Sequence, residues 1–310
     1  MKPSVPSERP LLSLALRIGA IAMISAMFMF AKLAGETGVA LPEMMFWRQL
    51  VPVIVLLGWL GMSGKLALLK TRRLGRHAIR AVTGMLGMTC GFGAAVLLPL
   101  AESTTLGFTT PLFAVILTAL VLRERVGPWR WTAVLVGFAG VLIVTRPGGE
   151  AIHPLGTAAG LTAGLMVAII SFQIRDLARS DGPTAVVFYF SLFGAAIMLA
   201  PLPFFITAHS PQQWALLVAV GLTGTIGQLL ISASLRVGAV ASVVAMDYTA
   251  LVWATLFGWA IWDHLPPPTT WIGAPLIIGA GLVVAWREHH LARLARRSYQ
   301  PSPASSLEVD

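Results

Sequence analysis

The sequence predicts an all-α integral membrane protein with ten transmembrane helices, arranged as two inverted five-helix repeats. Three observations support this fold class. Hydrophobic residues make up 56% of the 310 residues and charged residues only 11%, whereas a soluble domain carries about 25% charged residues. Long apolar segments follow one another along nearly the whole chain. The arrangement of the segment 102–147 recurs in the segment 241–285, and such self-similarity indicates repeated architecture.

Ten apolar segments are long enough to cross a bilayer, which requires about 20 residues of helix. Turn formers or charges separate them, for example at 181–183 (Asp-Gly-Pro) and 266–268 (Pro-Pro-Pro). They do not alternate as the strands of a membrane β-barrel would, so helices satisfy the backbone in lipid. We expect spans near residues 13–33, 43–62, 79–99, 103–122, 130–146, 155–174, 184–206, 214–234, 239–261 and 270–287.

The internal repeat consists of an apolar segment, a short polar turn and a second apolar segment rich in glycine. At an offset of 139 residues the turn residue Glu124 meets Asp263, and Gly140 meets Gly279. Pro111 meets Ala250, so we expect a proline kink in the first half only. The sequence therefore predicts a first repeat over 13–146 and a second over 155–287.

The distribution of Lys and Arg predicts the orientation. With the N-terminus inside, all but three of the 22 basic residues lie on the inner side or in the inner half of a span; the exceptions are Lys32, Arg48 and Arg146. Because five helices are an odd number, the second repeat enters from the opposite side. We expect a cytoplasmic N-terminus (1–12), a basic and then disordered cytoplasmic tail (288–310), and a location in the inner (cytoplasmic) membrane.

Several of these segments together resemble the EamA-like family of the drug/metabolite transporter superfamily. The resemblance covers both halves, and its individual motifs are weak while their order and duplication are specific. It rests on Arg48 near the start of the second span, Leu106 to Phe113, Leu122 to Val126 with Gly137 and Gly140, Ser242 to Tyr248, Leu251 to Trp253, and Gly258-Trp259.

This resemblance implies a secondary transporter in which ten helices surround a central cavity, with the fifth and tenth helices at the periphery. The expected substrate is a small organic metabolite, amino-acid-like or related, moved by alternating access, and we expect efflux. Uptake of a vitamin or a nucleoside-like cofactor is the alternative. The expected partners are this substrate and the lipid bilayer, for a monomer or homodimer. The net charge of +9 is explained by the inner loops, so we expect no nucleic acid.

Charged and polar residues within the spans are the candidates for substrate binding, because lipid disfavours them unless they are paired or face water. Arg48 is an expected anion contact, or alternatively an interfacial arginine that reaches the headgroups. Its counterpart in the repeat is Tyr189. Asp247 is the deepest carboxylate and the proton-coupling candidate, with a structural carboxylate as the alternative.

Further substrate-binding candidates are aromatic or amide side chains near these positions, together with one lysine. Tyr248 and Trp253 share the helix of Asp247, and each could simply pack. Lys32 lies at a helix end, where snorkelling is the alternative. The amides could equally connect helices. The remaining members of the set are Trp47, Gln173 and Gln228.

An intramembrane enzyme is the alternative from another class. The sequence Gly61-Met62-Ser63-Gly64 resembles a serine-protease motif, but we expect all six histidines to fall in loops, turns or the tail, and a serine nucleophile needs a base beside it. The single cysteine, Cys90, permits no disulfide within the chain. We therefore expect no catalytic residue, no cofactor and no metal site.

Overall fold

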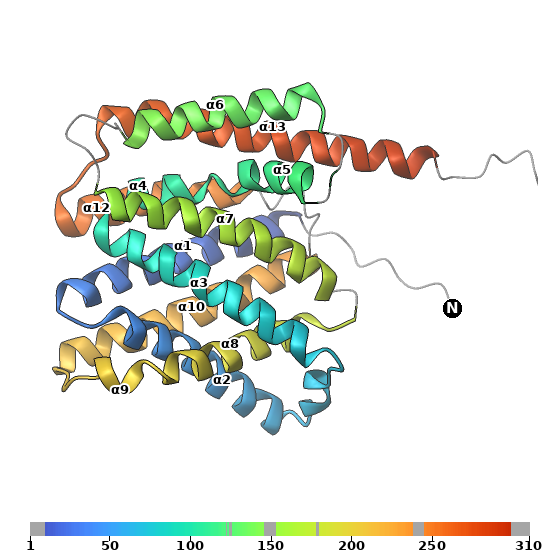
Figure 1. The fold of residues 1–310 in the computed structure, drawn as a ribbon. Coiled ribbons are helices and arrows are strands. Elements are labelled where there is room, and N and C mark those ends of the chain that lie inside the picture. Colours follow the sequence, from blue (N-terminus) through green and yellow to red (C-terminus); the bar gives the residue numbers. More distant parts are fainter. Residues whose placement is uncertain are drawn as a thin grey trace, which may run out of the picture.

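The computed structural model describes residues 10–121, 123, 126–145, 153–177, 180–237 and 245–298. All regular elements in these residues are helices, connected by short segments (Figure 1). Several predictions fall in part outside the described residues: the N-terminus before residue 10, the ends of the fourth and fifth spans at 122 and 146, the start of the ninth span at 239–244, and the tail after residue 298.

The helices follow the predicted segments closely, but several predicted spans consist of two pieces. The first half contains α1 (Pro10–Glu36), α2 (Leu41–Met62), η1 (Leu66–Leu69), α3 (Leu74–Leu97), α4 (Leu100–Gly107), α5 (Thr110–Leu120) and α6 (Pro128–Thr145). The second half contains α7 (Pro154–Leu177), α8 (Pro183–Leu199), α9 (Leu202–Phe205), α10 (Pro211–Val237), η2 (Ala245–Thr249), α12 (Ala250–Trp262) and α13 (Pro268–Ser298).

The all-α membrane fold is confirmed by the length and composition of these helices. Within the described residues, eight helical segments are long and apolar enough to cross a membrane, and α8 is a shorter apolar helix. Large apolar side chains such as Ile54, Leu135 and Val252 are exposed on the outside of the molecule. A lipid environment accommodates such a surface, whereas a soluble protein of this size rarely exposes one.

Helices of one half pack mainly against helices of the other, and each contact has a counterpart. α1 packs on α10 as α7 packs on α3, and α2 packs on α10 as α8 packs on α3. α4 and α5 contact α7, while η2 and α12 contact α1. α6 and α13 lie together at one edge of the molecule (Figure 1). These pairings are those of two similar halves that exchange partners.

The turns after α5 and α12 share an unusual backbone conformation. Arg123 (φ 53°) and Asp263 (φ 50°) are the two non-glycine residues with positive φ in the described part of the chain. A left-handed residue commonly ends a helix. The two positions are 140 residues apart, so the structural correspondence at this turn is shifted by one residue from the sequence pairing of Glu124 with Asp263.

The expected irregularity at Pro111 is observed, and the helical geometry also changes at the matching place of the second half. The helix breaks between α4 and α5 before Pro111, and a 3-10 turn (η2) likewise gives way to α12 at Thr249. Thr109 Oγ1 donates to the carbonyl of Leu106 (2.6 Å), and Thr249 Oγ1 donates to that of Met246 (2.7 Å). Such hydroxyl bonds compete with the helical ladder, and a threonine stands at the change of helical geometry in both halves.

Two glycines allow α6 and α13 to approach closely. A Cβ atom at Gly140 would lie 2.8 Å from the carbonyl oxygen of Gly273 and 2.9 Å from a side-chain carbon of Ile277. Gly279, the sequence counterpart of Gly140, has open space around its Cβ position. Only one member of this aligned pair therefore serves close packing.

We predict that Gly140→Ala lowers the free energy of unfolding by about 1–3 kcal/mol, because the added methyl group meets backbone. Thermal unfolding in detergent measures this effect. Gly279→Ala is the matched control, since it adds the same methyl group to open space and improves helix propensity. Equal destabilisation by the two substitutions would contradict the proposed role of the α6–α13 contact.

Candidate functional site

A cavity of about 340 Å³ lies between α2 and α3 of the first half and α8 and α10 of the second. Its wall is largely apolar and includes Leu56, Trp59 and Val187. The polar side chains that line it are Arg48, Arg80, Thr184, Ser191, Thr225 and Gln228. A pocket of about 300–1,000 Å³ with an apolar wall and few polar groups is typical of small-molecule sites.

The cavity occupies one end of the bundle. We call this the basic end, which contains η1 and the connection Lys70–Arg73, and we call the opposite end, with the connections 37–40 and 206–210, the far end. Most lining residues come from the halves of α2, α3, α8 and α10 nearest the basic end. The cavity reaches the surface at Trp59 and Pro183, which are both exposed.

Arg48 lies at the part of this cavity farthest from the basic end and is 3% exposed. Its Nε donates to the sulfur of Met27 at 3.0 Å. The guanidinium fits beside α10 because residue 224 is glycine; a Cβ atom there would lie 2.7 Å from Cζ of Arg48. The arginine therefore turns inward between helices and does not extend to the headgroups.

Arg80 was counted among the inner-side basic residues, but the structure places it in the cavity wall, 9% exposed. Its guanidinium carbon lies 4.3 Å from the centre of the Phe190 ring, a cation–π contact. Its Nε and Nη1 atoms are buried without a hydrogen-bond partner. The position of Arg80 along the helix is the sequence signal that could have identified it. Arg80 falls within an apolar helix, one turn beyond the exposed Arg76.

At the far end, Glu43 and His209 form a fully buried ion-pair contact between α2 and the connection before α10. His209 Nε2 lies 2.6 Å from Glu43 Oε1, and both side chains are 0% exposed. The rings of Trp47 and Trp214 pack around the pair, 5.3 Å apart. A buried cluster that includes Met44 and Met45 packs beside the pair.

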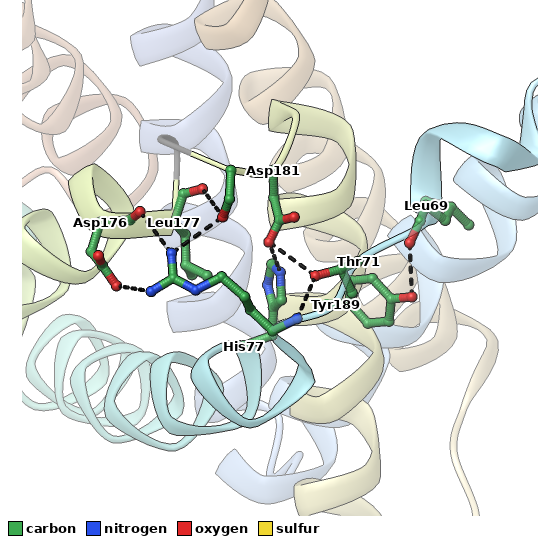
Figure 2. A network of polar contacts seen from close by, with 9 residues as sticks. Leu69, Thr71, His77, Asp176, Leu177, Asp181 and Tyr189 are labelled. Atoms are coloured by element: carbon green, nitrogen blue, oxygen red, sulfur yellow. Dashed lines mark hydrogen bonds and ion pairs between the residues drawn. The ribbon is translucent and has the colours of Figure 1, made fainter.

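At the basic end, a network of polar contacts connects α3 and η1 to the connection between α7 and α8 (Figure 2). Asp181 Oδ2 lies 2.9 Å from His77 Nε2 and accepts a hydrogen bond from Thr71. Arg73 Nη2 lies 2.6 Å from Asp176 Oδ2. As at the far end, a histidine and a carboxylate link the two halves. The helix pairs involved, α2 with α10 and α8 with α3, are counterparts in the repeat.

Tyr189, the predicted partner of Arg48, belongs to the basic-end network. Its hydroxyl donates to the carbonyl of Leu69 (2.9 Å), and its ring lies 5.0 Å from that of His77 (Figure 2). Trp47 packs on Trp214 and its Nε1 donates to Glu43 at 3.4 Å. Of the predicted residues, Arg48 and Gln228 line the cavity and these two aromatic residues do not.

Asp247 forms a bidentate ion pair with Arg17 that joins η2 to α1. Arg17 Nε and Nη2 each lie 2.6 Å from a carboxylate oxygen of Asp247. The Arg17 side chain is 9% exposed and that of Asp247 is 36% exposed. Arg17 had been counted as an inner-side basic residue, so the sequence contained both partners but did not indicate that they meet.

Tyr248 lies between the halves, where its ring meets that of Phe108 at 5.1 Å. These two residues are 140 positions apart and precede the two threonine-marked helix breaks. Trp253 stacks on Phe257 at 6.2 Å within α12. Both predicted aromatics therefore pack against other rings, away from the cavity wall.

Lys32 and Gln173 connect helices. Lys32 Nζ donates to the carbonyls of Ala95, Val96 and Leu98, so it satisfies the C-terminal end of α3. It also borders a smaller hollow of about 260 Å³ at the far end. Gln173 Nε2 donates to Thr83 Oγ1 at 3.1 Å, which links α7 to α3. Within the described residues, no group of three His, Cys, Asp or Glu side chains could hold a metal ion.

A cavity enclosed by the corresponding helices of two similar halves, in a chain of membrane-spanning helices, defines the class of repeat-built membrane transporters. The model of the EamA-like transporter family matches this chain twice, over residues 11–146 and 154–286. The chain therefore belongs to the EamA-like transporter family.

Characterised relatives are transporters with different substrates. A riboflavin transporter of Vibrio cholerae is 28% identical over 76% of this chain and 80% of its own length. A pseudopaline exporter of Pseudomonas aeruginosa is 26% identical over 87% of this chain and 96% of its own. An S-adenosylmethionine uptake transporter of Rickettsia prowazekii is 27% identical over 79% of this chain and 83% of its own.

A solved crystal structure shares the fold of this chain. It superimposes with a TM-score of 0.55 at 23% identity, over 91% of this chain and 99% of the other.

We predict that Asp247→Asn destabilises the protein by about 1–3 kcal/mol, because Arg17 loses its charged partner; the partial exposure of Asp247 keeps the loss below that of a fully buried pair. Arg17→Gln combined with Asp247→Asn should cost less than the sum of the single substitutions, as measured by thermal unfolding. The exposed Arg72→Gln is the control and should be additive with Asp247→Asn. If the losses of stability caused by Arg17→Gln and Asp247→Asn were additive, the pairing would be contradicted.

Proposed function

We propose that this protein is a secondary transporter of the inner membrane that moves a small organic metabolite through the cavity between its halves. The cavity carries this proposal, because it lies between helices of both repeats and contains the buried Arg48. The N-terminus and C-terminus would be cytoplasmic by the distribution of basic residues. The basic end is then the cytoplasmic end, and the cavity is open toward that side.

Alternating access requires contacts between the halves to break at one end while they persist at the other. We propose that the two carboxylate–histidine contacts, Glu43–His209 and His77–Asp181, act as latches at the far and basic ends. Each joins helices of different halves, and the two occupy corresponding helix pairs. Opening the far end while the basic end closes would present Arg48 to the opposite side.

We propose efflux as the direction, with uptake of a vitamin or nucleoside-like cofactor as the alternative. The pseudopaline exporter supports efflux, since it matches 87% of this chain. The S-adenosylmethionine uptake transporter, which matches 79%, supports the alternative. We propose the same site for either direction, since alternating access is reversible and the gradient of substrate or coupling ion decides the net flow.

We predict that a thiol at position 191 reacts from both sides of the membrane. Ser191 lines the cavity and is 2% exposed, and Cys90 is the one native cysteine, so Ser191→Cys in a Cys90→Ser background gives a single reporter. A membrane-impermeant methanethiosulfonate reagent is applied to inside-out and right-side-out vesicles. Ser234→Cys, which is 0% exposed and outside the cavity wall, is the control that should stay unreactive.

The latch substitutions should shift this reactivity in opposite directions. Glu43→Gln should increase the rate from the far side about five-fold, the population shift that about 1 kcal/mol produces. Asp181→Asn should increase the rate from the basic side by a similar factor. Labelling of Ser191→Cys from one side alone in every variant would contradict alternating access at this cavity.

Asp247 remains the proposed proton-coupling residue, with Arg17 as the charged group that faces it from α1. We predict that Asp247→Asn removes the pH dependence of transport in proteoliposomes, because an amide takes up no proton in this range. Transport is to be compared with and without an imposed pH gradient. A gradient-driven rate equal to that of the unsubstituted protein would exclude Asp247 as the coupling group and leave the Arg17 pair a structural one.

A further inference from the structure

The cavity contains two buried cations and no anion. Arg48 and Arg80 both belong to its wall, which includes no aspartate or glutamate. Within the described residues, four ion pairs form at 4.0 Å or less, and neither arginine takes part in them. The wall therefore carries positive charge without an acidic partner among its lining residues.

Such a charge is unfavourable unless something pairs with it. A guanidinium removed from water loses hydration that only a counter-charge or several acceptors can replace, and charged residues within spans mark substrate paths for this reason. Arg80 shows the deficit most directly: its side chain is 91% buried, and two of its three nitrogens have no hydrogen-bond partner. The ring of Phe190 supports one face of the guanidinium, and Arg80 belongs to the cavity wall, where a ligand could supply the missing acceptors.

The rest of the wall indicates what accompanies the anionic group. Leu56, Trp59, Val187 and Phe190 give the cavity a mainly apolar surface. The Thr225 hydroxyl already donates to the carbonyl of Gly221 (2.7 Å), so it faces a ligand as an acceptor only. A ligand with an apolar body and one or more negatively charged ends matches this wall, because guanidinium groups bind carboxylate and phosphate with paired hydrogen bonds.

We propose that the transported solute is an organic anion, and that Arg48 and Arg80 bind its carboxylate or phosphoryl groups. This inference rests on the proposed transport function and adds the substrate class. Arg80 is a specificity-determining residue that the sequence alone did not identify. A lipid phosphate could offer the same chemistry, since the cavity reaches the surface at Trp59 and Pro183, and the experiment separates the two sources.

The experiment uses four probes that share one phenyl ring and chain: 3-phenylpropionate, 3-phenylpropyl phosphate, 3-phenylpropionamide and 3-phenylpropylamine. The full-length protein is kept in dodecyl maltoside, a detergent without phosphate, and its Tm is measured with each probe. The carboxylate or the phosphate should raise the Tm by about 2 °C or more at saturation, whereas the amide and the amine should not. Arg48→Gln and Arg80→Gln should each abolish the shift.

Arg76→Gln is the matched control, because Arg76 lies on the same helix one turn earlier and is exposed. It removes the same charge and should leave the shift unchanged. A second measurement needs no ligand: Arg80→Met should raise the Tm of the ligand-free protein by about 2 °C or more, since it removes an unpaired buried cation. A lower Tm would show that Arg80 has a structural partner and would overturn the inference.

Other outcomes are equally decisive. A shift with the amine or amide as large as with the anions, an anion shift that persists in Arg80→Gln, or no shift with any probe would overturn the anion class. A larger shift with added phosphatidylglycerol than with every soluble probe would assign the arginines to a lipid headgroup. The proposed transport function fails separately, through one-sided labelling of Ser191→Cys, so the two failures can be distinguished.

Discussion

The rest of this structure depends on the packing of each half against the other. α1 and α2 pack on α10, while α7 and α8 pack on α3, so neither half buries its helices alone. In lipid, apolar surface gives little drive for helix association, and close packing through small residues replaces it. Gly224 beside Arg48 and Gly140 against Gly273 are such positions. The exchange of partners also creates the cavity, because its wall is shared between helices of the two halves.

The fold was predictable because its determinants are long-range in sequence and simple in physics. Length, apolarity and turn residues located the helices, and the repeat linked the two halves. The repeat was less informative at individual residues. Gly140 and Gly279 align, yet one contacts a backbone and the other faces open space. Pro111 has no proline counterpart, yet the helical geometry changes in both halves, at Thr109 and at Thr249, whose hydroxyls both bond to a preceding carbonyl. At these equivalent positions of the two halves, the backbone conformation is more similar than the side-chain contacts.

The candidate site could be predicted in part from the sequence, and basic residues account for much of what could not. Basic residues in a membrane protein serve two purposes, orientation and chemistry, and a sequence count treats them alike. Arg76 and Arg80 are one helical turn apart in α3, and depth alone separates an exposed cation from one in the cavity wall. Arg17 similarly meets Asp247 across 230 positions, a pairing that no local pattern contains. Tyr189 was a candidate as the counterpart of Arg48, and Lys32 as a lysine at the end of a span, but their hydrogen bonds go to backbone carbonyls of neighbouring segments.

The arrangement of charge connects the cavity to the two ends of the bundle. Outside the cavity, two pairs of buried ionisable groups meet across the halves: Glu43 with His209 at the far end, and Asp181 with His77 at the basic end. Inside the cavity the cations are left unmatched. Each of these pairs joins the two halves and lies beside a connection at one end of the bundle. If that end opened, water could replace the partner of each group. The two arginines of the cavity wall have no acidic partner there, so only a molecule that enters the cavity can supply a counter-charge. Binding of an anion would therefore remove the electrostatic penalty of the empty cavity, and this differential stabilisation is what a carrier requires to favour the loaded state during closure.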